Sequence, residues 1–152
     1  MIGNGIPVLV RRALCHVQAP EDLAANVITS MLAYSRQYYC EKSSLMHGVK
    51  DCLEGLKQRG IPMSICTNKD EIVAQMVVSA LGLSSYFNAI VGSRPDLVKK
   101  PDPLMLQIAA GAISSPMETT MMIGDSEVDA ATGIAASSVS VIVRGGYCHK
   151  PY

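Results

Sequence analysis

Four polar residues stand where the sequence passes from apolar segments into polar loops. Thr67 follows one apolar segment and Asp125 follows another, with Asp129 four residues later. Lys100 lies in the polar stretch between them. Carboxylates are hard oxygen ligands for Mg²⁺, and hydroxyl and backbone N–H groups can hold phosphate oxygens whose charge a lysine offsets. These residue types indicate a site for a phosphoryl group with a divalent cation, because phosphoryl transfer needs mainly positioning and charge neutralisation.

The same residues also have a purely structural interpretation. Asn68-x-x-Glu71 and Ser126-x-x-Asp129 have the spacing of capping boxes, which stabilise a helix start by about 1 kcal/mol and do no chemistry. Lys100 is equally compatible with a solvated loop. Their joint occurrence in this order, each next to the end of an apolar segment, favours the functional interpretation.

Alternating elements would position these residues. Short apolar segments predict four strands, at 61–66, 89–91, 120–123 and 140–143. Amphipathic segments between them predict helices, whereas residues 5–39 predict helix without any strand. This alternation is typical of an α/β fold with a parallel sheet and helices on both faces, in which ligands bind at the carboxyl ends of the strands.

Composition excludes several classes of protein. The 152 residues include 13 basic and 13 acidic side chains, so neither nucleic acid nor an acidic membrane surface is expected as a partner. No apolar run approaches the ~18 residues of a membrane span. The five cysteines show no C-x-x-C spacing, so we expect reduced thiols in a cytoplasmic protein, without a zinc site or a disulfide framework.

Three short motifs resemble those of the haloacid dehalogenase superfamily of phosphohydrolases. They are T-N-K at 67–69, K-P-D-P at 100–103 and G-D-S-x-x-D at 124–129. Within the superfamily the chain most resembles the phosphoglycolate phosphatase family, whose helical cap has a similar G-N-G segment, here at 3–5. The resemblance implies a partial helical cap at 1–47 and a Rossmann-like α/β core at 48–152, with a parallel sheet that lacks its first strand.

The resemblance also implies roles for the motif residues. Thr67 would hydrogen-bond the transferring phosphoryl group, and Asn68 would support the phosphate end of the substrate. Lys100 would stabilise the charge of the phosphoryl group. Asp125 would bind Mg²⁺, and Asp129 would complete the metal site by orienting the water shell of the ion.

The glycine-rich start of the chain belongs to the implied cap. Gly3, Asn4 and Gly5 would face the substrate, which the resemblance implies to be 2-phosphoglycolate or a similar small phosphorylated metabolite. The same glycines could be misread as a dinucleotide-binding fingerprint. Val8 occupies its third glycine position and no strand precedes it, which argues against a dinucleotide site.

One departure from the family pattern concerns catalysis. The family's nucleophile lies in a D-x-D-G-T/S motif on a central first strand, and none of the seven aspartates here forms a D-x-D. Loss of the nucleophile in covalent enzymes costs on the order of 10⁴ to 10⁶ in rate, so we expect impaired hydrolysis. The strands that precede Thr67 and Asp125 would then pair directly, leave a gap or recruit another chain.

Three interpretations are therefore open. The chain is a fragment of an ordinary phosphatase, with Met1 an internal methionine, or it is a degenerate paralogue that binds a phosphorylated ligand or a protein partner without turnover. The third is an unrelated receiver-like binding domain. That interpretation requires an acidic pair at the end of an earlier strand, which the chain does not provide.

Overall fold

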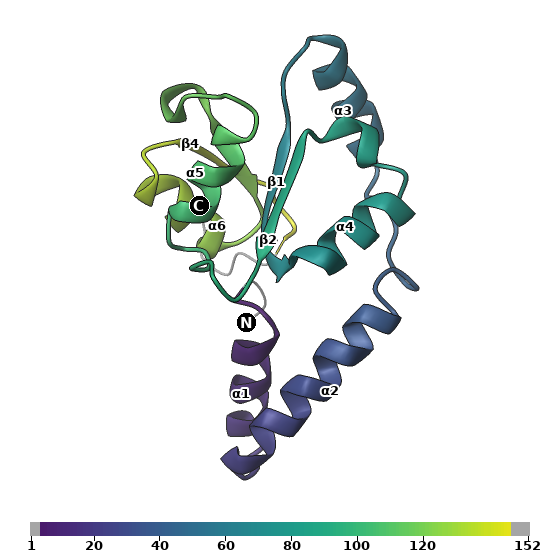
Figure 1. Cartoon of the computed structure of the whole chain (residues 1–152), viewed down its shortest axis with the longest axis vertical. Coiled ribbons are helices and arrows are strands. Elements are labelled where there is room, and N and C mark those ends of the chain that lie inside the picture. The colour runs from purple at the N-terminus through teal and green to yellow at the C-terminus, as the bar shows by residue number, and fades with distance from the viewer. Residues whose placement is uncertain (1–3, 147–152) are drawn as a thin grey trace.

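Two helices form a hairpin at one end of the molecule. The computed structural model describes residues 4–146 (Figure 1). Helices α1 (Ile6–His16) and α2 (Ala24–Gln37) pack on each other and are joined through a 3-10 turn at Glu21–Leu23. The segment 5–39, expected to be helical throughout, is confirmed as helical without any strand, except that residues 5, 17–20 and 38–39 lie outside its helices. Its break between α1 and α2 arises because Gln18 adopts a φ of +53° and Pro20 has no N–H to continue a helix.

The remainder alternates between strands and helices, as expected. The strands are β1 (Ser64–Asp70), β2 (Ala89–Ser93), β3 (Met121–Gly124) and β4 (Val139–Ile142). The helices are α3 (Val49–Gln58), α4 (Glu71–Ala80), α5 (Leu104–Gly111) and α6 (Glu127–Ala135). Short 3-10 turns lie at Ser84–Tyr86 and Met117–Thr119. No helix within residues 4–146 is long and apolar enough to cross a membrane.

The first strand was predicted with the wrong bounds. It begins at Ser64 instead of residue 61, and it continues through Thr67 to Asp70. Pro62 explains the late start, because proline cannot donate a hydrogen bond to a ladder. The continuation means that Thr67 and Asn68 lie within β1, close to its carboxyl end, and do not follow it.

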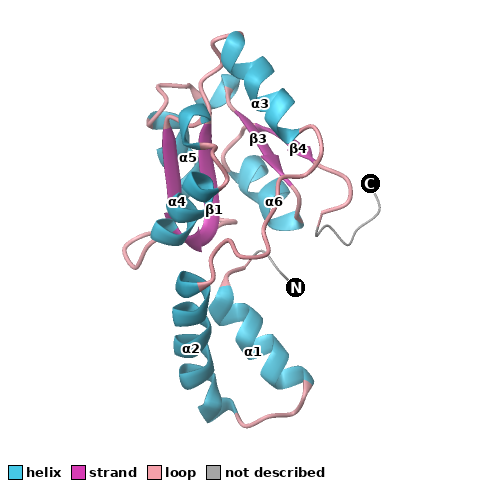
Figure 2. Ribbon diagram, turned by 90° about the vertical axis from the view of Figure 1, so that its right-hand side faces the viewer, coloured by secondary structure: helices cyan, strands magenta, loops and turns pink. Residues whose placement is uncertain are grey.

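The four strands form two parallel sheets. β1 pairs with β2, β3 pairs with β4, and no ladder in the described part of the chain joins β1 to β3. Helices α4 and α5 pack against the β1–β2 sheet, and α6 packs against the β3–β4 sheet. Figure 2 shows the two pairs of strands side by side above the hairpin. The parallel α/β class is confirmed, and the two strands expected to flank a missing one do not pair.

Helix α5 supplies apolar contacts to both sheets. Its Met105 is buried with Val91 of β2, and the next residue, Leu106, is buried with Met122 of β3. Cys66 of β1 packs against both clusters. The two sheets therefore share a core through α5, although their strands are not hydrogen-bonded to each other.

Candidate active site

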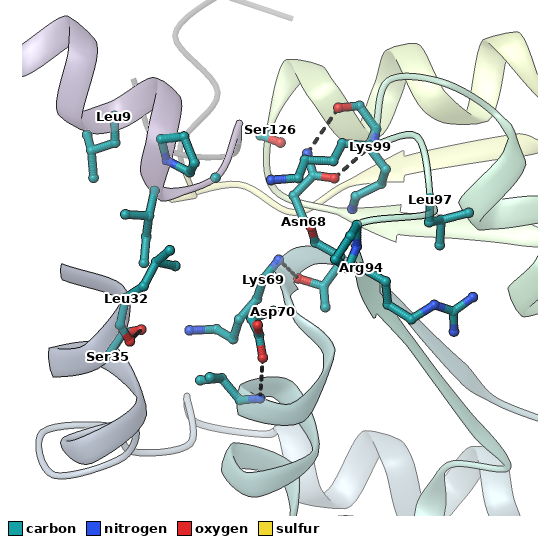
Figure 3. A pocket seen from close by; sticks show the side chains of 18 of the residues that line it. Leu9, Leu32, Ser35, Asn68, Lys69, Asp70, Arg94, Leu97, Lys99 and Ser126 are labelled. Atoms are coloured by element: carbon teal, nitrogen blue, oxygen red, sulfur yellow. Dashed lines mark hydrogen bonds between the residues drawn. The ribbon is translucent and has the colours of Figure 1, made fainter. Parts of the chain in front are cut away.

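A cavity of about 630 Å³ lies between the hairpin and the carboxyl ends of the strands (Figure 3). Its lining includes five of the residues predicted to form the site: Thr67, Asn68, Lys100, Asp125 and Asp129. Gly5 also lines it, whereas Asn4 does not and Gly3 lies outside the described residues. Residues separated by up to 124 positions in the sequence thus meet at one cavity.

Thr67 presents a hydroxyl near the end of β1. Its Oγ1 accepts a hydrogen bond from the backbone N–H of Lys69 at 3.2 Å. A hydroxyl is one donor as well as an acceptor, so the O–H of this half-buried side chain can still donate to a ligand oxygen.

Asn68 ties β1 to the loop that carries the site lysine. Its Nδ2 donates to the carbonyl of Lys100 at 3.0 Å, and its Oδ1 accepts from the N–H of Lys100 at 2.9 Å. Asn68 is buried, and these two bonds fix the backbone of Lys100 against the strand end. In this structure its amide therefore positions Lys100.

Lys100 links the two sheets with its side chain. The peptide bond between Lys100 and Pro101 is cis. The Lys100 Nζ donates to the carbonyl of Cys66 in β1 at 2.8 Å and to Oδ1 of Asp129 in α6 at 2.6 Å. The lysine is only 7% exposed, so this ion pair is buried.

Asp129 accepts hydrogen bonds on both carboxylate oxygens. Oδ2 accepts from the N–H groups of Asp125 and Ser126, at 3.0 and 3.1 Å, and from the Ser126 hydroxyl at 2.7 Å. The predicted capping box of Ser126 and Asp129 is thus confirmed, and the same carboxylate holds Lys100. Burial alone would raise the pKa of Asp129, but the hydrogen bonds from Lys100 and Ser126 outweigh it and lower the pKa.

Glycine is required beside this carboxylate. A Cβ at Gly124 would collide with the Asp129 side chain. The G-D-S-x-x-D motif therefore combines a close approach of β3 to α6 with a buried, hydrogen-bonded acid.

Asp125 is a carboxylate of the cavity without a partner among the described residues. It is half-buried, it lines the cavity, and its side chain makes no hydrogen bond or ion pair with residues 4–146. No group of three His, Cys, Asp or Glu side chains that could hold a metal occurs in that range. One free carboxylate fits an ion such as Mg²⁺, which keeps several waters and takes further ligands from phosphate oxygens.

Asp70 has two structural roles that were not predicted from the sequence. It is the N-cap of α4, where its Oδ1 accepts from the N–H of Val73 at 3.2 Å. Its Oδ2 pairs with Arg36 of α2 at 2.9 Å, so it also anchors the hairpin. The capping-box interpretation of Asn68 with Glu71 is consequently wrong, since α4 starts only after Asp70.

Hydrogen bonds also set the charge state of Asp70. Burial would raise its pKa, but the hydrogen bonds from Arg36 and from the Val73 N–H outweigh it and hold the pKa below the usual value. An Asp directly before an amphipathic helix is a recognisable N-cap signal, whereas its ion pair with a residue 34 positions away has no signal in the sequence.

Comparisons with known proteins agree on one family. Residues 2–137 match the model of haloacid dehalogenase-like hydrolases. A phosphoglycolate phosphatase of Cereibacter sphaeroides is 34% identical over 152 residues, which cover 99% of this chain and 69% of the relative. One of Colwellia psychrerythraea is 34% identical over 151 residues, covering 96% of this chain and 67% of the relative.

Solved structures show the same likeness. A predicted phosphoglycolate phosphatase from Haemophilus somnus 129pt superposes with a TM-score of 0.85 at 25% identity, covering 99% of this chain and 69% of that one. A β-phosphoglucomutase from Clostridium difficile superposes with a TM-score of 0.77 at 18% identity, covering 95% of this chain and 66% of that one. At that identity the second likeness concerns the fold alone.

Proposed function

We propose, from the premise that the chain belongs to the haloacid dehalogenase-like hydrolase family, that its cavity binds a small phosphate monoester. Its relatives include proteins named phosphoglycolate phosphatase, which supports 2-phosphoglycolate or a similar small metabolite as the ligand. Residues 1–47 act as a partial cap over the core at 48–152. The setting is cytoplasmic, and neither nucleic acid nor a membrane is a partner.

The placement of Lys100 carries this proposal. Its ammonium group has three N–H donors, and the Cys66 carbonyl and Asp129 take two of them. The third is available to a phosphate oxygen, to which the Thr67 hydroxyl can also donate. A buried cation attracts a phosphate more strongly than an exposed one does, because the low dielectric around it weakens the Coulomb attraction less.

Asp125 would hold Mg²⁺ in this proposal. When bound, the ion would neutralise phosphate charge. Asp129 would act as a positioning residue, since both of its oxygens are occupied and one of them accepts the N–H of Asp125. Asn68 would likewise act through the backbone of Lys100.

Turnover by this chain is proposed to be slow. The sequence contains no D-x-D, and of the three acids lining the cavity Asp70 and Asp129 are held in ion pairs. Asp125 is assigned to the cation in this proposal, so the lining offers no further unpaired acid as a nucleophile. This favours the second candidate function, binding of a phosphorylated ligand or partner without turnover.

Calorimetry with inorganic phosphate and Mg²⁺, beside an assay of phosphate release from 2-phosphoglycolate, tests both candidates. We expect binding with little release. Asp125→Asn should abolish the enhancement of binding by Mg²⁺ without disturbing packing, because the side chain has no described partner, and Lys42→Met, at an exposed position outside the cavity, serves as the control. Absence of phosphate binding by the unmodified chain would refute the proposal, and rapid release would refute the impairment.

A further inference from the structure

A loop that follows β4 lies against Asp125. The backbone N–H of Val143, directly after β4, donates to the carbonyl of Gly124 at 2.8 Å, which holds the start of the loop beside the end of β3. Three residues later, Gly146 comes so close to Asp125 that no side chain fits between them. The loop therefore contacts the residue that carries the proposed cation ligand.

The contact involves both the side chain and the backbone of Asp125. A Cβ placed on Gly146 would overlap the Cβ of Asp125, and it would lie 2.7 Å from the Asp125 carbonyl oxygen and 3.0 Å from its Oδ2. These separations are well inside the distance of about 3.5–4.0 Å at which non-bonded heavy atoms make favourable contact. Gly146 is not among the lining residues of the cavity, so it reaches Asp125 from outside the cavity.

Packing orients the Asp125 carboxylate within the described part of the chain. The backbone of Asp125 is fixed, because its N–H donates to Oδ2 of Asp129 at 3.0 Å. Its side chain, in contrast, forms no hydrogen bond or ion pair with residues 4–146. Such a side chain rotates among staggered positions unless its neighbours occupy the space. Gly146 occupies the space beside its Cβ and Oδ2, and so limits the positions that the carboxylate can take.

The two adjacent glycines of the loop have different reasons to be glycine. Gly145 has a φ of +86°, which other residues rarely adopt, and a Cβ there would meet nothing within 4 Å. Gly145 is therefore needed for the turn of the backbone alone. Gly146 lies outside the left-handed region, so its backbone is compatible with alanine and the space beside Asp125 is what excludes a side chain. The requirement for glycine at position 146 belongs to the site.

Resting on the proposed cation site, we propose that Gly146 is a positioning residue for Asp125, which holds the carboxylate by packing in the orientation that binds Mg²⁺. A methyl group at position 146 forces either the carboxylate or the loop to move, because the backbone of Asp125 is held by Asp129. Either movement removes the support of the carboxylate. Substituting residues that orient a metal ligand typically lowers metal affinity by about 10- to 100-fold.

Gly146→Ala tests this role against a matched control. Gly111→Ala adds the same methyl group at a position where it meets nothing within 4 Å and where the backbone is not left-handed. Calorimetry measures the affinity for Mg²⁺ in saturating inorganic phosphate, and the affinity for phosphate without Mg²⁺. We expect Gly146→Ala to lower the Mg²⁺ affinity by about 10- to 100-fold and to leave the Mg²⁺-free phosphate affinity unchanged. Gly111→Ala should change neither.

A second variant shows whether Gly146 acts through the Asp125 carboxylate. The phosphate affinity in the presence of Mg²⁺ is compared between Asp125→Asn and the double variant that also carries Gly146→Ala. Because Asp125→Asn already removes the proposed cation ligand, we expect the second substitution to have no further effect, as for two residues that act as one unit. A further loss in the double variant would overturn the role, since Gly146 would then act elsewhere in the site.

The outcomes separate the role of Gly146 from the proposed function. A Mg²⁺ affinity of Gly146→Ala equal to that of the unmodified chain overturns the role and leaves the phosphate and cation sites standing. Loss of Mg²⁺-free phosphate binding in Gly146→Ala also overturns it, because the loop would then support the whole site. An unmodified chain that binds phosphate without Mg²⁺ overturns the cation site and the role together. Since residues 143–146 are exposed, Gly146→Ala should melt like the unmodified chain, which circular dichroism checks.

Discussion

The two sheets of the core differ in how well helices cover them. The β1–β2 sheet lies against α4 and α5, which bury Val73, Val91 and Met105. The β3–β4 sheet has α6 on the side of Met122, while Met121 and Ile123 on the alternate positions are 54% and 57% exposed. The first sheet has a packed core of its own, whereas the second depends on α5 and Lys100 for its attachment. Both contribute to the site, so the attachment matters for binding.

Lys100→Met should produce the largest change. It removes the link between the sheets and leaves Asp129 buried without its counter-charge, which destabilises by about 3–5 kcal/mol. Urea unfolding measures the loss. Adding Asp129→Asn should recover part of it, because the uncompensated charge is then gone. If Lys100→Met alone were as stable as the unmodified chain, the ion pair between Lys100 and Asp129 would not join the sheets.

Truncating one methionine in each sheet region sharpens the contrast. Met105→Ala should cost about 2–5 kcal/mol, because the side chain is fully buried between α5 and the β1–β2 sheet. Met121→Ala should change the stability by less than about 0.5 kcal/mol, because its side chain is largely exposed. Thermal unfolding followed by circular dichroism compares them. Similar losses in both variants would mean that the outer face of β3 is covered in solution.

Asn68→Ala should cost about 1–3 kcal/mol, since it leaves the N–H and carbonyl of Lys100 without their partner. It should also weaken phosphate binding, although Asn68 is not expected to be the main phosphate ligand. Asn68→Asp is the informative companion, because it keeps the acceptor for the Lys100 N–H and loses the donor. Unchanged phosphate affinity in Asn68→Ala would argue against a positioning role.

Among the polar contacts, the ion pair between Arg36 and Asp70 should give the smallest effect. Both side chains are partly exposed, so Asp70→Asn should cost at most about 1 kcal/mol at neutral pH. The folded pKa of Asp70 is lowered, so this contribution is present above the unfolded pKa of about 4 and is lost as the pH falls below it. Stability curves of the two proteins should therefore converge in acid. A difference in stability between Asp70→Asn and the unmodified chain that persists in acid would not arise from this ion pair.

Local patterns predicted the elements and the gathering of the site. The apolar segments before Thr67 and Asp125 indicated parallel strands, whose carboxyl ends meet, and the cavity lining agrees. Local patterns could not reveal partners that the fold alone brings together. The amide of Asn68 bonds a backbone 32 residues away, although its spacing from Glu71 suggested a helix cap. The division into two sheets likewise depends on pairing between distant strands.

The bond between Arg36 and Asp70 bears on how fast a ligand enters and leaves. It fastens α2 to the start of α4 beside the cavity, and it is a weak, partly exposed contact that dissolved ions screen. The anchor at Lys100 is buried and screened far less. A higher ionic strength should therefore shorten the residence time of a bound phosphate ester. It should do so mainly by weakening the contact between Arg36 and Asp70 that holds the hairpin, and less by weakening the contacts of Lys100.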